Sequence, residues 1–196
     1  MLLHYDPSRP VYVVGQGISA DELYYWISQI TKLVESVSTE EYLNLSANSQ
    51  CILGVQNFDY RHEFFQNTSV ANRHWVSYIH PTAYITQLDL IGRSVVVGPK
   101  VTTGYKTQIN NFSCICQSSS IGHNTVIGNN NVVSPNTTIG GSTIIGDNVL
   151  IGQASSIRDK ISIVSNVRFL MSSAVTRDIT ESGIYFGNKK VPNAQM

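Results

Sequence analysis

The sequence predicts a small α/β domain over residues 1–76, followed by a parallel β-helix of six-residue (hexapeptide) repeats over residues 77–196. The first observation is the repeat itself: a large apolar residue stands at every sixth position from Ile79 to Val175, with Thr103 as the exception. The second is that this register is absent before Ile79, where short apolar runs alternate with helical patterns. The third is composition. Charged residues make up 13% of the chain, well below the usual share of roughly 25%, while 42% of the residues are hydrophobic, which argues against disorder.

The front domain begins with a strand and a helix. Residues 11–14 (VYVV) predict a buried strand, and residues 15–17 (GQG) a glycine-rich turn. Ser19 followed three residues later by Glu22 is a capping-box pattern, which predicts the start of a helix. Apolar residues at helical spacing then extend this helix through Val34.

The remainder of the front domain completes a small Rossmann-like βαβ unit. Ser38 precedes a short helix over residues 40–45, residues 51–55 (CILGV) predict a second core strand, and a third helical run covers residues 58–65. A strand, a glycine-rich turn, a helix and a second strand in this order are typical of half of a nucleotide-binding α/β sheet.

The turn formed by Gly15, Gln16 and Gly17 has two interpretations. It either cradles a pyrophosphate at the start of the following helix or provides a tight turn between strand and helix. In dinucleotide-binding sheets an acidic residue ends the second strand roughly 20 residues further on. Only Glu35 is near that place, and the strand before it looks truncated. The pattern therefore disfavours a dinucleotide and leaves room for another nucleotide-linked ligand.

The six-residue period predicts a β-helix because an α-helix would repeat its apolar stripe near 3.6 residues. Each repeat forms one flat face and one corner, three faces close a triangle, and the repeats make five to six coils. The large aliphatic residue points into the bore, and we expect the glycine that often follows it to help the chain bend. Small or β-branched residues two positions earlier share the bore, among them Ala83, Val95, Ser113, Ser119, Thr125, Thr137 and Ser155.

The register runs without an inserted loop, so the outer walls of the β-helix are expected to be smooth. Walls made of apolar or small residues with few charges would favour association if they were exposed on an isolated chain. We therefore expect each chain to bury such a wall against symmetry-related copies, most simply in a cyclic homotrimer.

Composition excludes several classes of protein. The formal net charge is zero, which argues against a nucleic-acid partner. No apolar stretch approaches the ~20 residues of a membrane span, and the first ten residues are too short and too polar for a signal peptide, so we expect a cytoplasmic protein. The cysteines are Cys51, Cys114 and Cys116. Their spacing fits neither a zinc site nor a redox motif, which predicts reduced thiols and no metal.

Several motifs together resemble a known family. They are residues 11–17 (VYVVGQG), the junction at residues 79–83 (IHPTA), residues 120–128 (SIGHNTVIG) and residues 139–148 (IGGSTIIGDN). The chain resembles the bacterial sugar-nucleotide acetyltransferases of the bacillosamine and sialic-acid pathways, from the first strand to the tail near Gly187. The resemblance implies that the β-helix is left-handed.

The resemblance also implies an activity: transfer of an acetyl group from acetyl-CoA to the amino group of a nucleotide-linked sugar in cell-surface glycan synthesis, with O-acetylation as the nearest alternative. It implies that His123 is the general base, next to Asn124, and that the backbone N–H of Gly141 holds the oxyanion. No metal is required, because the thioester carries its own leaving group. In the family the front domain holds the nucleotide, here through Gly15, Gln16, Gly17 and the stretch from Gln56 and Asn57 to Arg61.

The same resemblance places the acetyl-CoA groove between adjacent β-helices of the trimer. Gly141, Ile151 and Gly152 would line this groove. Lys189 and Lys190 would either pair with the phosphates of CoA or form a solvated basic end.

The sequence departs from the family in ways that support a second hypothesis. Asn124 replaces the Asp or Glu that usually follows the base; its amide oxygen can accept the ring N–H but cannot stabilise an imidazolium as a carboxylate does. Val164, Leu170 and Ser172 stand where glycine is common near the CoA arm. These departures leave open a catalytically silent trimeric binding module.

Overall fold

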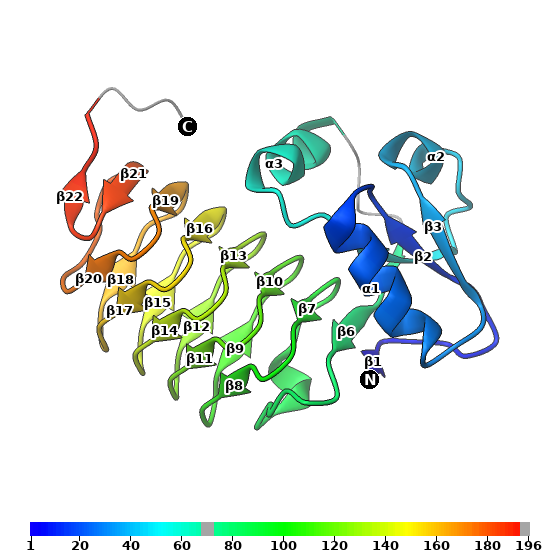
Figure 1. Ribbon diagram of the computed structural model, residues 1–196, viewed down its shortest axis with the longest axis horizontal. Helices are drawn as coiled ribbons and strands as arrows, with labels where there is room; N and C mark the ends of the chain where they lie inside the picture. Colours follow the sequence, from blue (N-terminus) through cyan, green and yellow to red (C-terminus); the bar gives the residue numbers. More distant parts are fainter. Residues whose placement is uncertain (68–72, 193–196) are drawn as a thin grey trace. The chain divides into compact units, whose positions relative to one another are not determined.

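The protein was analysed as a computed structural model that describes residues 1–67 and 73–192 (Figure 1). The chain divides into two compact units, Met1–Ile79 and His80–Met196, which are described separately below. Within the described ranges no helix is both long enough and apolar enough to cross a lipid bilayer.

The first unit is built on a parallel sheet with the strand order β3-β2-β4-β5. The central strand, β2, is almost entirely buried and pairs along its full length with both neighbours. A separate antiparallel pair joins β1 to β6. The elements are β1 (Leu2–Leu3), β2 (Val11–Val14), α1 (Ile18–Ser28), β3 (Val34–Val37), α2 (Thr39–Leu43), β4 (Gln50–Leu53), α3 (Phe58–Asn67), β5 (His74–Trp75) and β6 (Ser77–Ile79).

Two of the sequence predictions for the region between α1 and α2 are wrong. The first helix does not continue through Val34 but ends at Ser28, because residues 34–37 form strand β3. That strand is not truncated: its four residues pair with β2 from Val11–Val34 to Val14–Val37. Glu35 therefore lies within β3 and not at its end, where an acidic residue would reach a ribose.

The helix caps also differ from the sequence prediction. Ser19 lies inside α1, which begins after Gly17 and has no side-chain cap, so the predicted capping box there is wrong. A complete capping box instead starts α2. The hydroxyl of Ser38 accepts from the backbone N–H of Glu41 at 3.0 Å, and the Glu41 carboxylate accepts from the Ser38 N–H at 2.7 Å. The N-terminal N–H groups of α1 are thus left without a side-chain acceptor, whereas those of α2 are satisfied.

The second unit is a parallel β-solenoid with three walls, in which strands pair with the strand eighteen residues further on, as Cys114 does with Val132. The last pair of wall 1 is closer in sequence, since Phe169 pairs with Tyr185 sixteen residues on. Wall 1 contains β7 (Val96–Val97), β10 (Cys114–Ile115), β13 (Val132–Val133), β16 (Val149–Ile151), β19 (Val167–Phe169) and β21 (Gly183–Phe186), to which β22 (Lys189–Lys190) adds an antiparallel edge. Wall 2 contains β8 (Thr102–Thr103), β11 (Ser120–Ile121), β14 (Thr138–Ile139), β17 (Ser156–Ile157) and β20 (Ala174–Val175). Wall 3 contains β9 (Gln108–Ile109), β12 (Val126–Ile127), β15 (Ile144–Ile145) and β18 (Ser162–Ile163). A short 3-10 turn, η1 (Leu88–Leu90), lies in the first coil.

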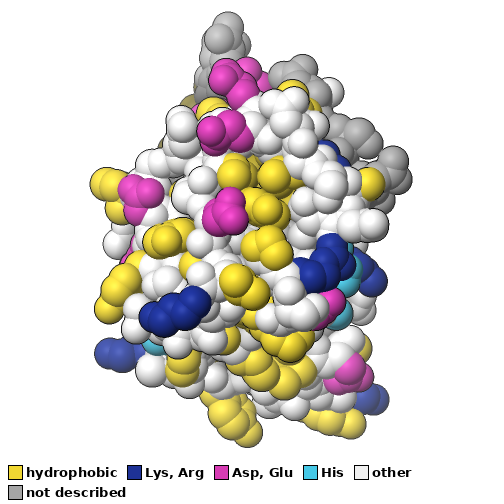
Figure 2. Space-filling view, turned by 90° about the vertical axis from the view of Figure 1, so that its right-hand side faces the viewer, with side chains coloured by type: hydrophobic (Ala, Val, Ile, Leu, Met, Phe, Trp, Pro, Cys, Tyr) yellow, Lys and Arg dark blue, Asp and Glu magenta, His cyan; other side chains and the backbone are white. Residues whose placement is uncertain are grey.

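The bore of the solenoid confirms the six-residue register. From Ile91 to Val175, every sixth residue points inward and is buried, including Thr103, which is 5% exposed. Charged residues make up only 13% of the chain. Figure 2 shows the face that carries the first unit, where hydrophobic and other uncharged side chains predominate and Lys, Arg, Asp and Glu are scattered among them. Because stacked coils satisfy each other's backbone groups, the fold needs few charges.

The corners of the solenoid do not use glycine for the bend, contrary to expectation. The left-handed backbone conformation falls on non-glycine residues three positions after each bore residue, such as Asn124 with a φ of 55°. Glycine is needed instead for close stacking. A Cβ on Gly104 would lie 2.4 Å from the backbone nitrogen of His123, and one on Gly122 would lie 2.4 Å from that of Gly141. The residues with positive φ at these corners are Ser94, Lys100, Lys106, Phe112, Ser118, Asn124, Asn130, Asn136, Ser142, Asn148, Ala154, Lys160, Asn166 and Ser172.

The small polar residues in the bore tie successive coils together. Thr125 donates from its hydroxyl to the carbonyl oxygen of Gly140 at 3.0 Å, and Ser113 does the same to Gly128 at 2.8 Å. In each pair the acceptor lies fifteen residues later, at a corner of the next coil. These bonds satisfy corner carbonyls that the strands do not reach, and they hold the coils in register.

Candidate active site

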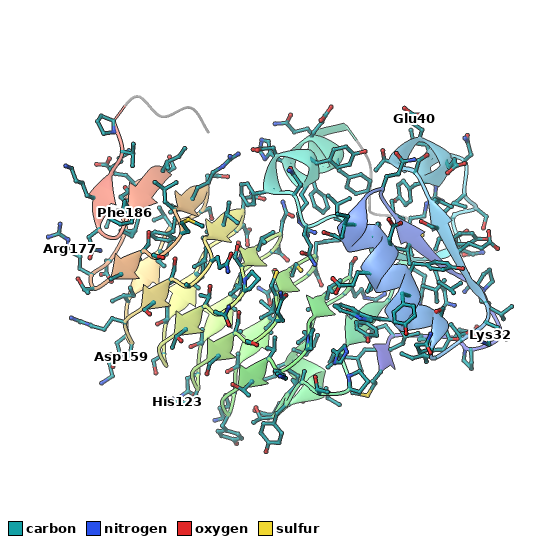
Figure 3. The ribbon with its side chains drawn as sticks, in the orientation of Figure 1. Lys32, Glu40, His123, Asp159, Arg177 and Phe186 are labelled. Carbon is teal, nitrogen blue, oxygen red and sulfur yellow. The ribbon has the colours of Figure 1, made fainter. Side chains whose placement is uncertain are left out.

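The corner between walls 2 and 3 stacks the residues with the strongest functional signal. One column of this corner, at intervals of eighteen residues, contains Tyr105, His123, Gly141 and Asp159; we call it the histidine corner. Figure 3 shows His123 and Asp159 along the same edge of the solenoid. His123 and Asn124 are exposed, which confirms that the imidazole lies outside the bore near a corner.

The backbone around His123 is held from both sides. The N–H of Asn124 donates to the carbonyl oxygen of Tyr105 at 2.8 Å, and the N–H of Ser142 donates to the carbonyl oxygen of His123 at 2.7 Å. The imidazole then lies over Gly141 of the next coil, since a Cβ added to Gly141 would be 3.0 Å from Nε2 of His123. Glycine at position 141 thus leaves the space that the ring occupies.

The second ring nitrogen of His123 is positioned by its neighbour. Nδ1 lies 3.0 Å from Nδ2 of Asn124. In this orientation the amide donates to Nδ1, so the neutral ring carries its proton on Nε2. A half-turn of the amide presents Oδ1 instead, which accepts from Nδ1–H and leaves Nε2 free to take a proton. Asn124 can therefore support either tautomer.

The backbone N–H of Gly141 is available at the same place. At equivalent corner positions the N–H donates to a side chain of the next coil, as in Asn129 to Asp147 at 2.6 Å and Asp147 to Ser165 at 2.9 Å. Among the hydrogen bonds of the described residues, none uses the N–H of Gly141. A donor and a basic nitrogen on adjacent coils are the two groups that acyl transfer requires.

Replacement of Gly141 by alanine is expected to reduce the rate of an acyl transfer at this corner while leaving the fold intact. The added Cβ meets only side-chain atoms of His123, so the ring moves aside and kcat falls by about 10- to 100-fold. The matched control is Gly146→Ala, whose Cβ would lie 2.6 Å from the backbone nitrogen of Ser165, away from the histidine corner; it is expected to cost about 1–3 kcal/mol of unfolding free energy. Steady-state kinetics and thermal melts separate the two. Full activity in Gly141→Ala would contradict this account of the ring.

The structure does not bring the predicted CoA residues to one corner. Gly141 belongs to the histidine corner, whereas Ile151 and Gly152 lie at the corner between walls 1 and 2. Gly152 is half-buried there, and a Cβ on it would be 2.5 Å from the backbone nitrogen of Met171. Ile151 points into the bore and is 1% exposed, so its side chain does not line a groove and only its backbone remains for that role. Leu170 and Met171 stack above Gly152 and are exposed.

Wall 2 connects the corner at Gly152 to the histidine corner. Its outward residues are uncharged, small and exposed: Thr102, Ser120, Thr138, Ser156 and Ala174. In the tail, Lys190 forms an ion pair with Glu181 at 3.0 Å, whereas Lys189 is exposed on β22. The structure thus already gives Lys190 an anionic partner within the chain.

A cavity of about 450 Å³ lies in the first unit. It brings together two residues from the sequence prediction, Gln16 and Asn57. It is lined by Gln16, Val55, Asn57, Asp59, Tyr60 and Glu63. Asp59 and Tyr60 fall within the stretch considered from sequence, but Glu63 was missed. Its spacing of four residues from Asp59 on a predicted helix was the available signal.

The glycine loop stands at the edge of this cavity. Gly15 has a φ of 122°, and a Cβ on it would lie 2.4 Å from Cγ2 of Val55. Gly17 is the N-cap of α1 with a φ of 95°, and a Cβ on it would meet nothing within 4 Å. The loop is therefore packed against Val55, just after β4, on one side and open on the other.

Of the other predicted nucleotide-binding residues, Gln56 and Arg61 do not line the cavity, and Asn57 lines it while also capping α3. Arg61 is 2% exposed and donates to the carbonyl oxygen of Val55, so its guanidinium supports the cavity wall and is turned from solvent. The side chain of Asn57 caps α3 by accepting from the N–H of Tyr60 at 3.0 Å. Gln56 is half-buried and does not line the cavity.

The cysteine thiols and the acidic side chains of the described residues do not indicate a cysteine nucleophile or a metal site. Burial raises the pKa of the Cys51 thiol to about 12, which removes it as a nucleophile at neutral pH. Cys114 and Cys116 are also buried. Within residues 1–67 and 73–192, no group of three or more His, Cys, Asp or Glu side chains could hold a metal ion.

The fold and this corner define a class, the hexapeptide-repeat β-solenoid proteins. The family model described as the GMPPB C-terminal domain matches residues 75–185, more than half of the chain, and the chain belongs to that family. A comparison with curated proteins finds no match to this sequence.

Solved structures with the same fold cover almost all of the chain. The acetyltransferase domain of PglB from Neisseria gonorrhoeae, in complex with acetyl coenzyme A, is 18% identical with a TM-score of 0.81, over 94% of this chain and 98% of that chain. PerB from Caulobacter crescentus, in complex with CoA and GDP-perosamine, is 16% identical with a TM-score of 0.74, over 89% of this chain and 92% of that chain. The resemblance inferred from the sequence is thus confirmed at the level of the fold.

Proposed function

We propose that this chain is an acetyl-CoA-dependent N-acetyltransferase that acts on a nucleotide-linked amino sugar in cell-surface glycan synthesis. The observation that carries the proposal is the imidazole of His123 lying over Gly141, with a hydrogen-bonded Asn124 behind it. The solved structures with this fold include proteins described as binding acetyl coenzyme A and as binding CoA with GDP-perosamine. Acetyl-CoA is the co-substrate in this proposal, and no metal takes part.

His123 serves as the general base in the proposed reaction. As the amine nitrogen of the sugar bonds to the carbonyl carbon of the thioester, Nε2 of His123 takes a proton from the nitrogen. The N–H of Gly141 donates to the oxyanion of the tetrahedral intermediate. When the C–S bond breaks, the imidazolium returns its proton to the departing sulfur. The amide product and the CoA thiol balance the reaction.

The first unit holds the nucleotide in this proposal. We assign residues 1–76 to a Rossmann-like nucleotide-sugar domain and residues 77–196 to a left-handed β-helix with the tail. The diphosphate lies at the loop formed by Gly15, Gln16 and Gly17, because α1 begins there with no side-chain cap on its N–H groups. Asn57 and Arg61 support the cavity beside the loop, and Gln56 adjoins them.

The acetyl-CoA groove is assigned to wall 2 of one chain facing a neighbouring copy in a homotrimer. The uncharged outward residues of wall 2 lie between Gly152 and the histidine corner. The same wall therefore carries both ends of the proposed groove. Lys189 is assigned to a CoA phosphate, since Lys190, although also exposed, forms an ion pair with Glu181. Acetyl-CoA and sugar nucleotides are intracellular metabolites, so we place the reaction in the cytoplasm.

The proposal is tested by thiol release from acetyl-CoA with a panel of UDP- and GDP-linked amino sugars. Turnover with at least one amino sugar, yielding a base-stable amide, supports N-acetylation. A product that mild base cleaves identifies an ester and favours O-acetylation. If no substrate gives turnover and calorimetry detects no CoA binding, the chain is a silent binding module. Crowding of the Gly152 corner by Leu170 and Met171 is the observation that favours this second candidate.

Replacement of Asn124 by aspartate is expected to raise kcat/KM. A carboxylate accepts from Nδ1–H and stabilises the imidazolium that forms during proton transfer, whereas the amide does so only through its oxygen dipole. The same assay at several substrate concentrations measures the effect. An unchanged or lower kcat/KM would show that Asn124 is not a weaker substitute for a carboxylate.

A further inference from the structure

The cavity in the first unit is a preformed site with a mixed polar lining. Tyr60 contributes its ring, and its hydroxyl is held 2.8 Å from that of Thr39. The backbone N–H of Tyr60 is fixed by the Asn57 cap. Tyr60 is thus held through its hydroxyl and its backbone N–H, and it is 40% exposed and lines a cavity of about 450 Å³. Its ring provides a surface on which a planar ligand can stack.

Two carboxylates give this cavity its charge. Asp59 and Glu63 are four residues apart on α3, so their side chains lie on the same face of the helix, and both line the cavity. No lysine or arginine is among the lining residues. A diphosphate is repelled from this part of the site, whereas a ligand that presents N–H donors is attracted.

The phosphate and carboxylate regions meet at Gln16. This residue belongs both to the glycine loop before α1 and to the lining of the cavity. If the diphosphate lies at the loop, as the proposed function requires, the nucleoside extends along Gln16 toward Asp59 and Glu63. The carboxylates then face the base or the ribose.

The hydrogen-bonding edges of the bases differ in their match to a carboxylate. Guanine presents N1–H and the 2-amino group side by side, and one carboxylate accepts from both. Uracil presents a single N3–H between two carbonyl oxygens. The lone pairs of these oxygens would face the lone pairs of the carboxylate, which is repulsive. Adenine offers only its 6-amino group, next to the acceptor N1. A cavity with acidic acceptors therefore discriminates in favour of guanine.

We propose that the cavity selects guanine, through the carboxylates of Asp59 and Glu63 with the base stacked on Tyr60, so that the substrate is a GDP-linked sugar. This inference rests on the proposed function for the position of the diphosphate. It names the nucleotide that the first unit accepts.

Calorimetric titration of the full-length chain with GDP, UDP, ADP and IDP tests the proposal. GDP is expected to bind at least tenfold more tightly than UDP or ADP. IDP, which keeps N1–H but lacks the 2-amino group, is expected to lie between them. Equal affinity for GDP and UDP overturns the proposal.

Two variants assign the selectivity to the cavity. At least one of the variants Asp59→Asn and Glu63→Gln is expected to reduce the preference for GDP over UDP by tenfold or more, because an amide presents a donor where guanine needs an acceptor. Glu22→Gln, exposed on α1 and outside the lining, is the matched control. Since Asp59 lies in the first turn of α3, a thermal melt accompanies each variant, and Glu63→Gln serves if Asp59→Asn unfolds. An unchanged preference in a folded Glu63→Gln and in Asp59→Asn overturns the proposal.

A ribose contact is distinguished from a base contact by 2′-deoxy-GDP. Tight binding of this nucleotide supports the base contact; loss of affinity, together with equal binding of GDP and UDP, assigns the carboxylates to the ribose and overturns the proposal. Acetyl transfer to an amino sugar with no preference for guanine defeats only this inference. Selective GDP binding without turnover on any amino sugar defeats only the proposed function.

Discussion

The variant His123→Ala is expected to lose acetyl transfer by a factor of about 10² to 10⁴ in kcat/KM. Alanine removes the only group in the described part of the histidine corner that combines a basic nitrogen with contact to Gly141. Because His123 is exposed and its side chain fills no core, the variant should fold normally. Thiol release from acetyl-CoA with the preferred amino sugar measures the loss.

His80→Ala is the control for this prediction. His80 is a second histidine of the solenoid unit, in its first coil, and its Nδ1 lies 2.9 Å from the hydroxyl of Thr82. Its removal is expected to leave kcat/KM within about twofold. If His123→Ala retains more than a third of the original kcat/KM, His123 is not the general base, and the proposed mechanism is wrong.

The largest effect on stability is expected from Asn131→Leu. Asn131 is fully buried in the bore; its Nδ2 donates to the carbonyl oxygen of Gly146 at 2.8 Å, and its Oδ1 accepts from the N–H of Val149 at 2.6 Å. Leucine has a similar volume but leaves both backbone groups unsatisfied. The expected loss is about 2–5 kcal/mol of unfolding free energy, or a Tm lower by roughly 5–20 °C for a chain of this size.

Asn131→Ser provides an internal check on this explanation. Ser113 occupies the equivalent bore position one coil earlier, donates to Gly128 at 2.8 Å and accepts from the N–H of Asn131 at 3.2 Å. Serine at position 131 can therefore repeat both bonds, and we expect a smaller loss than with leucine. Asn110→Leu, which removes only an exposed side-chain contact with Gln108, should change the Tm little. Equal Tm values for Asn131→Leu and Asn131→Ser would show that these hydrogen bonds do not stabilise the coil.

The repeat could be predicted from the sequence because its cause is local and recurs in every coil. Each coil has to place an apolar side chain in the bore, and Thr103 remains buried although it is not apolar. The position of His123 outside the bore follows from the same register. The glycine roles could not be predicted, because the reason for Gly104 and Gly122 is the backbone of a coil that lies eighteen residues away.

The front unit was harder to predict for the same reason. The two residue pairs Ser19–Glu22 and Ser38–Glu41 have the same spacing, yet only the second forms a capping box. The helical pattern that reached Val34 was overridden when β3 paired with β2. Pairing of β3 with β2, and packing of the helices on these two strands, decided between the local alternatives.

The sequence by itself determined the β-solenoid, the burial of every sixth residue from Ile91 to Val175 and the exposure of His123, since these follow from a period that the chain repeats without interruption; Ile85, in the first coil, is only half-buried. Only the tertiary structure decided that the His123 ring lies over Gly141, that Arg61 is buried, and that Asp59, Tyr60 and Glu63 surround one cavity with Gln16. The physical reason is that a period specifies which way a side chain points, whereas contacts between residues far apart in sequence depend on how coils and strands stack.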